Sequence, residues 1–298
     1  MNSKKINIGV IGSGHLGQYH VKHYKNMNNI NFLGLHDSNP ERGNEIAKKY
    51  ETKYFENVSN LMEICDGVSI VTPTESHYDV AKIALNEFCC NVFIEKPITE
   101  TISQADDLIN HAQKNDLIIQ VGHIERLNPA LKALEKYDIN PKFIDIQRLA
   151  PYTARGTDVP VVLDLMIHDI DILLSLVKSK VKSIHASGVS ILTNSVDIAH
   201  ARIRFENGTV SSVTASRVAK DKVRKIKIFQ DNLYSTIDLL LEQTEIYNIT
   251  KDSNLIENAL QAEPFPGDNE KKYIVYEKPK IKNYDSLREE LNNFVNSI

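Results

Sequence analysis

Short apolar runs alternate with amphipathic segments along the first 120 residues of the chain. The segments between the runs have helical spacing. The first run is apolar throughout, which is typical of a strand buried on both faces of a parallel sheet. The alternation predicts a doubly wound parallel α/β sheet with right-handed crossovers. The expected strands are 6–11, 31–35, 67–71, 91–95 and 117–121.

After Gly122 the pattern changes to long strand-like runs with few helices between them. Asn207-Gly208 stands between two such runs, and Asn-Gly in that position favours a tight hairpin. Asp231-Asn232 predicts a second turn of the same kind. Consecutive hairpins indicate an open, mainly antiparallel sheet, so we expect an α+β domain in this half.

The two patterns divide the chain into domains of residues 1–122 and 123–298. Residues 251–283 are polar and contain three prolines, which predicts a long loop or lid. Ser286-x-x-Glu289 then predicts a capped last helix with apolar positions at helical spacing. We place this helix in the second domain.

Composition and charge exclude several classes of protein. The chain has 298 residues and a net charge of −4, which give no general attraction to nucleic acid or to an anionic membrane. No apolar run approaches the roughly 20 residues of a membrane span, and no segment resembles a signal peptide. Cys65, Cys89 and Cys90 lack the spacing of metal ligands. We expect a cytoplasmic protein with reduced thiols, no metal, and neither nucleic acid nor membrane as partner.

A glycine-rich turn, Gly12-x-Gly14-x-x-Gly17, follows the first predicted strand and opens the first helix. Glycines so placed allow a tight turn and a close approach of the backbone to a pyrophosphate at the helix N-terminus. Asp37 stands 20 residues after Gly17, where a carboxylate binds a ribose diol and repels a 2′-phosphate. The pattern predicts a Rossmann domain over 1–122 that prefers NAD to NADP. The alternative is a glycine turn without a ligand.

Glu95-Lys96-Pro97 closes the fourth predicted strand. Ligands of such folds gather at the carboxyl ends of the strands, so Lys96 is well placed beside a nicotinamide. Pro97 restricts the backbone of Lys96, and the bond between them could be cis. The alternative is a surface lysine at a turn.

Thr72 and His77 follow the third predicted strand and are candidates for contacts with ribose or nicotinamide. The alternative is that this segment only caps the next helix and forms its exposed first turn. The expected cofactor-binding residues are therefore Gly12, Ser13, Gly14, His15, Leu16, Gly17, Asp37, Thr72, Pro73, His77, Glu95 and Lys96.

The predicted helix over 161–177 is apolar except for one polar stripe. Asp164, His168 and Asp171 fall at i, i+4 and i+7, so we expect them to share a face. One alternative is the solvated stripe of a surface helix. The other is an Asp-His pair that binds a metal, but no third ligand is evident in the sequence.

Polar side chains also cluster in 122–129, where His123, Arg126 and Asn128 follow the fifth predicted strand. Arginine is a natural ligand for an anion or a sugar hydroxyl, and Arg155 offers a second guanidinium in the loop before the long helix. We expect substrate contacts from these four residues. The alternatives are an interdomain salt-bridge cluster for the first segment and a solvated loop residue for Arg155.

Four motifs in order resemble the glucose–fructose oxidoreductase / inositol dehydrogenase (Gfo/Idh/MocA) family: the glycine turn, Thr72-Pro73 with His77, Glu95-Lys96-Pro97, and the Asp-x-x-x-His helix. The resemblance implies an N-terminal Rossmann domain, a C-terminal domain for substrate binding and oligomerisation, and a homodimer or homotetramer that often packs through the open sheet. The family pattern at the helix is Asp-x-Gly-x-His-x-x-Asp. Met166 replaces the glycine here, from which we expect a reshaped floor of the substrate site.

Residues 123–129 and 163–169 resemble the branch of this family that oxidises the 3-hydroxyl of UDP-N-acetylglucosamine to a ketone, ahead of a 3-amino sugar for lipid A-type glycolipids. The resemblance implies that NAD takes the hydride and that His168 accepts the proton. Lys96 would stabilise the developing alkoxide and Asp164 would hold a neighbouring hydroxyl. Arg126 and Arg155 would bind the diphosphate.

Three alternatives to this function remain. The first is a dehydrogenase of another sugar or of an inositol. The second is an enzyme similar to biliverdin reductase, although its tetrapyrrole site needs no clamp for sugar hydroxyls. The third is an NAD-binding regulator without catalysis, which loss of Lys96 or His168 would favour, and both residues are present.

Overall fold

The structure is a computed structural model that describes residues 5–153, 159–267 and 271–298. The chain divides into two compact units. The first comprises the residues up to Ile124 together with Asp285–Ile298, and the second is Glu125–Tyr284. The expected domains differ from these units at the C-terminal end, because the last helix belongs to the first unit.

A parallel sheet forms the centre of the first unit, with the strand order β2-β1-β3-β4-β5. Its order and its parallel pairing confirm the α/β prediction. The strands β1, β3 and β4 carry buried side chains on both faces, as the continuous apolar runs indicate. Their bounds are β1 (Ile6–Ile11), β2 (Ile30–His36), β3 (Gly67–Ile70), β4 (Asn91–Glu95) and β5 (Ile119–Gly122).

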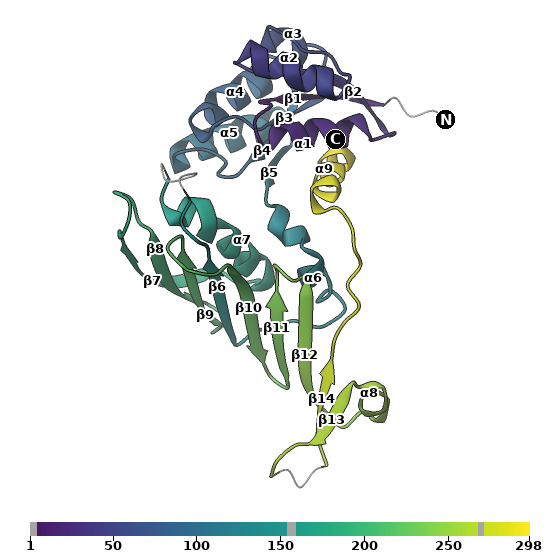
Figure 1. The fold of residues 1–298 in the computed structure, drawn as a ribbon, viewed down its shortest axis with the longest axis vertical. Helices are drawn as coiled ribbons and strands as arrows, with labels where there is room; N and C mark the ends of the chain where they lie inside the picture. Colours follow the sequence, from purple (N-terminus) through teal and green to yellow (C-terminus); the bar gives the residue numbers. More distant parts are fainter. Residues whose placement is uncertain (1–4, 154–158, 268–270) are drawn as a thin grey trace. The chain divides into compact units, whose positions relative to one another are not determined.

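Helices cover both faces of this sheet (Figure 1). One core receives side chains from α3 (Val58–Met62), α4 (Thr74–Asn86) and α5 (Ile102–Lys114). The other core receives them from α1 (Gly17–Lys25), α2 (Pro40–Lys49) and α9 (Ser286–Ser297).

The last helix, α9, belongs to the first unit because its apolar stripe completes one of these cores. Leu287, Leu291, Phe294 and Val295 are buried there with residues of β1 and α1. The Phe294 ring meets the Phe93 ring edge-on, with centroids 5.9 Å apart. The amphipathic pattern of α9 was visible in the sequence, whereas the surface that it covers was not.

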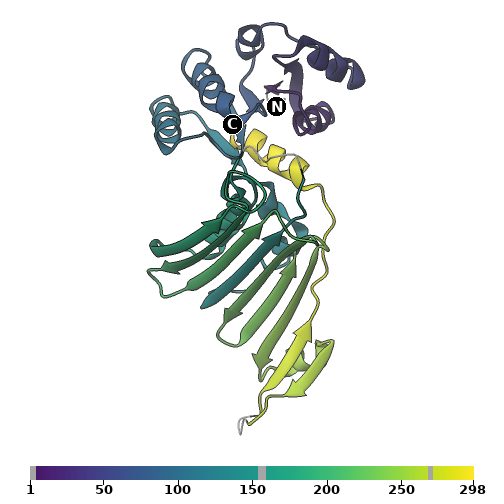
Figure 2. The ribbon, with the colours of Figure 1, turned by 60° about the vertical axis from the view of Figure 1, so that its left-hand side comes forward.

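A nine-stranded sheet forms the second unit, with the order β13-β14-β12-β11-β10-β6-β9-β8-β7 (Figure 2). Every pair in it is antiparallel except β6 with β9. The expected hairpins are present, with positive φ angles at Gly208 and Asn232 in their turns. The bounds are β6 (Phe143–Leu149), β7 (Val181–Val189), β8 (Ile198–Phe205), β9 (Val210–Ser216), β10 (Val223–Gln230), β11 (Leu233–Asp238), β12 (Gln243–Thr250), β13 (Gln261–Pro264) and β14 (Tyr273–Glu277).

A single core packs against one face of this sheet, with buried side chains from α6 (Pro129–Lys132), the π-helical turn η2 (Val162–Met166) and α7 (Ile167–Leu176). The 3₁₀ turn η1 (Ile124–Leu127), which begins at the last residue of the first unit, and α8 (Ser253–Asn258) contribute no buried side chain. The prediction of one α-helix over 161–177 is therefore wrong in its first turn, which is π-helical. None of the helices in the described part of the chain is long and apolar enough to cross a membrane.

The prediction of a loop or lid over 251–283 is wrong for much of that segment, since α8, β13 and β14 lie within it. Strand β14 pairs with β12 and adds to the sheet. Its sequence Tyr273-Ile274-Val275-Tyr276 is β-branched and aromatic, and Val275 is fully buried. This short strand signal was obscured by the polar residues and prolines around it.

Candidate active site

The turn between β1 and α1 has a backbone that only glycine fits at two positions. Gly12 has φ +92°, and a Cβ there would lie 2.6 Å from the carbonyl oxygen of Val71. A Cβ on Gly17 would overlap the carbonyl oxygen of Gly12. At Gly14 a Cβ would meet nothing within 4 Å, so this stretch of backbone faces open space. The turn thus fits the approach of a cofactor pyrophosphate at the N-terminus of α1.

Asp37, just past β2, is bound to this turn. Its Oδ2 accepts hydrogen bonds from the backbone N–H of Ser13 (2.6 Å) and from the Ser13 hydroxyl (2.7 Å), and its Oδ1 accepts one from the Asn39 N–H (2.9 Å). Partial burial raises the pKa of Asp37, but the hydrogen bonds from Ser13 and Asn39 outweigh it and hold the pKa below the usual value. A charged carboxylate therefore stands beside the glycine turn, as a ribose site requires.

His77 lies between the ends of β3 and β4. The ring is buried, its Nε2 lies 2.9 Å from the Thr72 carbonyl oxygen, and its Nδ1 lies 2.9 Å from the Pro97 carbonyl oxygen. The side chain thus links the segment after β3 to the turn that carries Lys96, so the structure favours a positioning role over direct contact with a ligand. The hydroxyl of Thr72 is buried and has no hydrogen-bond partner among the described residues.

Lys96 follows the last residue of β4, and the Lys96–Pro97 peptide bond is cis. The preceding residue, Glu95, accepts a hydrogen bond from Nε2 of His20, 3.1 Å from its Oε1. His20 is fully buried on α1, where its ring meets the Phe93 ring edge-on. A Cβ on Gly122 would lie only 3.0 Å from the Glu95 carboxylate, so glycine makes room for that side chain. Glu95 is therefore held by its neighbours next to the lysine.

His123, at the end of β5, donates its backbone N–H to Oε1 of Glu290 on α9, at 2.6 Å. The Glu290 side chain is buried, and its backbone carbonyl accepts a hydrogen bond from Gln120. The sequence did not indicate this role of Glu290. The available signal was a glutamate on the apolar stripe of α9, one residue before Leu291.

The polar stripe of the long helix is divided between two kinds of helix. Asp164 lies in η2, whereas His168 and Asp171 lie in α7. Short π-helical turns inside α-helices occur frequently at functional sites. Met166 is buried in the core of the second unit, and the reshaped floor of the substrate site that we expect from it stays a prediction.

Arg126 forms a two-pronged ion pair with Asp171. Its Nε donates to Oδ2 at 2.6 Å and its NH2 to Oδ1 at 2.5 Å. The Arg126 side chain is 52% exposed and that of Asp171 is 8% exposed. Arg126 of η1, which the sequence predicts to bind an anion, thus pairs with Asp171 of the predicted polar stripe.

A second and more deeply buried set of ion pairs surrounds Arg148 of β6. Its Nε and NH2 donate to the Asp169 carboxylate at 2.9–3.0 Å, and its NH1 donates to Glu125 at 3.2 Å. Burial lowers the pKa of Arg148, but Asp169 and Glu125 outweigh it and raise the pKa. This role of Arg148 is not among the sequence predictions. Its signal was an arginine at the buried position of the alternation Ile144, Ile146, Arg148.

The remaining predicted substrate residues have different outcomes. Asn128 caps α6 through its Oδ1, which accepts the Ala130 N–H, and its Nδ2 donates to the Leu239 carbonyl. These bonds give it a structural role, and its contact with substrate stays a prediction. Arg155 lies outside the described residues. No group of three potential metal ligands occurs within 5–153, 159–267 and 271–298.

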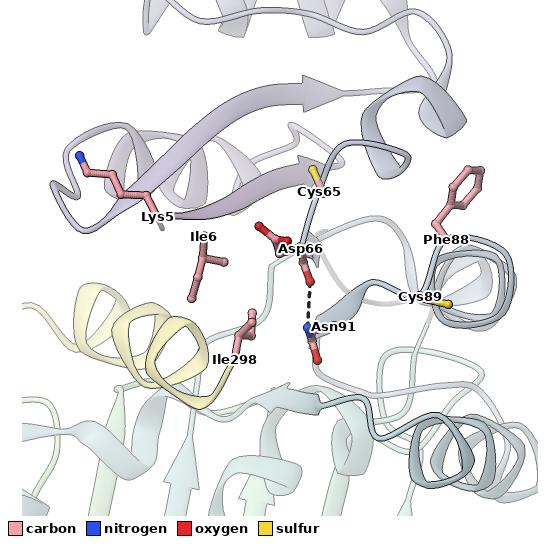
Figure 3. Close-up of a pocket in the computed structure, with 8 residues that line it drawn as sticks. All are labelled: Lys5, Ile6, Cys65, Asp66, Phe88, Cys89, Asn91 and Ile298. Atoms are coloured by element: carbon pink, nitrogen blue, oxygen red, sulfur yellow. Dashed lines mark hydrogen bonds between the residues drawn. The ribbon is translucent and has the colours of Figure 1, made fainter. Parts of the chain in front are cut away.

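One pocket of about 430 Å³ lies at the amino ends of the parallel strands, opposite the end that carries the glycine turn (Figure 3). Lys5, Asp66 and Asn91 line it at the amino ends of β1, β3 and β4, whereas cofactors bind at the carboxyl ends. The Asn91 amide donates to the Asp66 carbonyl at 2.8 Å. Burial raises the pKa of the nearby Cys65 thiol, which disfavours the reactive thiolate. This pocket is not the cofactor site.

Comparison with known proteins connects the geometry to a family. Residues 6–123 match the model of an oxidoreductase family with an NAD-binding Rossmann fold, and residues 146–232 match the GFO/IDH/MocA C-terminal domain. UDP-N-acetylglucosamine 3-dehydrogenase from Acidithiobacillus ferrooxidans is 38% identical over 241 residues, which cover 80% of this chain and 76% of the relative. Myo-inositol 2-dehydrogenase from Thermotoga maritima is 26% identical over 80% of this chain and 79% of the relative.

The solved structures agree with the sequence relatives. The UDP-N-acetylglucosamine 3-dehydrogenase of A. ferrooxidans superposes with a TM-score of 0.86 at 33% identity, covering 99% of this chain and 89% of the other. Both units of the present chain are thus matched by one relative in sequence and in fold. The chain belongs to the GFO/IDH/MocA family of oxidoreductases with an NAD-binding Rossmann domain.

Proposed function

We propose that the protein oxidises the 3-hydroxyl of UDP-N-acetylglucosamine to a ketone, with NAD as the hydride acceptor. The observation that carries this proposal is the 38% identity, over 80% of the chain, to the A. ferrooxidans enzyme of that activity. The chain also has an acid–base set for such chemistry in Lys96, Asp164 and His168. A place ahead of 3-amino sugar formation for a lipid A-type glycolipid follows from that activity.

The glycine turn and Asp37 favour NAD as the cofactor. The backbone at Gly14 faces open space for a pyrophosphate, and the lowered pKa of Asp37 keeps its carboxylate charged at neutral pH. A charged carboxylate accepts hydrogen bonds from a ribose diol and repels the 2′-phosphate of NADP. Ser13, His15, Leu16, Thr72 and Pro73 would line the same cofactor site.

In the proposed mechanism, the protein moves the proton and orients the sugar. The cofactor, when bound, accepts the hydride from the carbon that bears the hydroxyl. His168 removes the hydroxyl proton, and Lys96 donates a hydrogen bond to the same oxygen as negative charge develops on it. Asp164 accepts a hydrogen bond from a neighbouring hydroxyl and fixes the orientation of the ring.

The residues near the carboxyl end of β5 would recognise the rest of the substrate. His123 and Asn128 would contact the sugar, and Arg126 with Arg155 would bind the diphosphate. Arg126 already donates two N–H groups to Asp171, and its side chain is half exposed, so an anion in solvent can reach the guanidinium. We propose that it contributes to binding the diphosphate while it remains paired.

We also propose a cytoplasmic homo-oligomer, a dimer or tetramer that packs through the open sheet. A row of aromatic rings crosses neighbouring strands, with successive centroids 4.8–5.9 Å apart. Several of these rings are more than a third exposed, which favours burial against another sheet. The row consists of Phe143, Phe229, Tyr234, Tyr247 and Tyr276.

The test follows the absorbance of the reduced nicotinamide while the protein is incubated with NAD and UDP-N-acetylglucosamine. A panel of free sugars, phosphorylated sugars and inositols is run alongside. The expected result is turnover with UDP-N-acetylglucosamine well above that with any other compound. Preferential turnover of an inositol, to which the T. maritima relative points, would assign a different substrate. Bound NAD without turnover of any compound would indicate a regulator.

A further inference from the structure

Six charged side chains of the second unit join η1, the sheet and α7 in two linked sets of ion pairs. Three are acidic and three are basic, so the cluster is balanced in formal charge. They are Glu125, Arg126, Arg148, Asp169, Asp171 and Arg224.

Arg148 is at the centre of the deeper set. Its side chain is 2% exposed, and it projects from β6 at a position otherwise occupied by core isoleucines. The guanidinium contacts Asp169 through two nitrogens and Glu125 through the third. Arg224 donates to the same Glu125 oxygen at 2.8 Å. A planar fork of this kind cannot be reproduced by lysine, which presents a single point charge.

The partners of Arg148 are the sequence neighbours of predicted site residues. Asp169 directly follows His168, and Glu125 directly precedes Arg126. The ion pair between Arg126 and Asp171 provides a second link between η1 and α7. The two short segments that resemble one branch of the family, 123–129 and 163–169, are therefore connected to one another through Arg148.

We propose that Arg148 is a positioning residue, which holds η1 and α7 against the sheet so that His168 stands in its working orientation. This inference rests on the proposed function for the role of His168. It assigns Glu125 and Asp169 to this support. Small displacements of a reacting group lower turnover strongly without unfolding a protein.

The alternative is that the cluster serves stability alone, and a neutral variant separates the two roles. Arg148→Met by itself would leave the buried carboxylate of Asp169 without its cation and Glu125 with Arg224 alone, which is strongly destabilising. The triple variant R148M/E125Q/D169N removes the three buried charges together and retains similar side-chain volumes. Arg224 loses its carboxylate partner, but its side chain is 41% exposed, so water can solvate the guanidinium. Arg148→Lys keeps the charge without the fork. Lys225→Met is the matched control, since Lys225 is on β10 next to Arg224 and forms an ion pair with Asp238 at 3.6 Å.

The experiment measures kcat, KM and the Kd for NAD, together with amide hydrogen exchange in η1 and α7. We expect the triple variant to bind NAD like the wild type, to lose about 100-fold in kcat, and to exchange faster in both η1 and α7. R148K should show the same changes to a smaller extent, and K225M should show neither. If the folded triple variant keeps the kcat and the exchange of K225M, the proposal is overturned.

The design also separates this inference from the proposed function. If the wild type oxidises a different sugar of the panel, the same kinetic comparison is made with that sugar. If it oxidises none, the proposed function fails and hydrogen exchange decides whether Arg148 holds η1 and α7. If the triple variant does not fold, R148K decides: kcat and exchange equal to those of K225M would overturn the proposal.

Discussion

At the scale of single residues, the proposed chemistry depends on His168 in the first turn of α7. Its replacement by alanine removes the proposed base and leaves the glycine turn and Asp37 intact. We expect kcat to fall by about 100- to 10,000-fold, while the Kd for NAD measured by fluorescence titration stays within experimental error. His185→Ala, an exposed histidine of β7, serves as the control. Equal losses of kcat and NAD affinity in the His168 variant would remove it from the chemical step.

The proposed preference for NAD over NADP depends on Asp37. Asp37→Ala removes the carboxylate that would repel a 2′-phosphate, so the ratio of the Kd for NADP to the Kd for NAD should fall. Titration of both cofactors into the wild type and the variant measures this ratio. An unchanged ratio would contradict the assignment of Asp37 as the discriminating residue.

The lowered pKa of Asp37 also has a consequence for stability in acid. Its folded-state pKa lies below the unfolded value of 3.8, so its contribution is fully present above that value and is lost as pH falls through the folded-state pKa. Asp37→Asn should therefore destabilise the protein at pH 7, and the difference from the wild type should shrink below pH 3.8. Urea unfolding at a series of pH values tests this. A difference that persists unchanged in acid would indicate that charge is not involved.

At the scale of elements, α9 is the least expected component, because it completes the core of the first unit from the far end of the chain. Phe294→Ala should lower the free energy of unfolding by about 3–5 kcal/mol, the usual cost of deleting a buried phenylalanine. Asn296→Ala, at an exposed position of α9, is the control. Equal urea midpoints for the two variants would show that α9 does not stabilise this core.

Some helices and strands could be predicted from the sequence and others could not. The parallel strands were predictable because a strand buried on both faces is apolar along its whole length, as Ile6–Ile11 is. The hairpins at Gly208 and Asn232 were predictable because their turns need positive φ angles. The π-helical start of the long helix was not, since periodicity cannot distinguish a local widening of the turn.

The residues of the candidate site also divide into those with a local sequence signal and those without one. The glycine turn, Asp37 and the Lys96 turn were found because each has a local backbone or charge requirement. Arg148 and Glu290 were missed because their roles depend on partners distant in sequence, 21 residues away at Asp169 and 167 away at His123. The role of a buried charged residue can be predicted from a sequence only when the residue of opposite charge that pairs with it is known.

At the scale of the whole molecule, the chain is an oxidoreductase of the GFO/IDH/MocA family with an NAD-binding Rossmann domain. We propose that hydride leaves carbon 3 of UDP-N-acetylglucosamine. The most direct test supplies NAD and substrate deuterated at carbon 3, and examines the reduced cofactor by mass spectrometry. We expect reduced cofactor that carries one deuterium. Reduced cofactor without deuterium, or no reduced cofactor at all, would contradict hydride transfer from carbon 3.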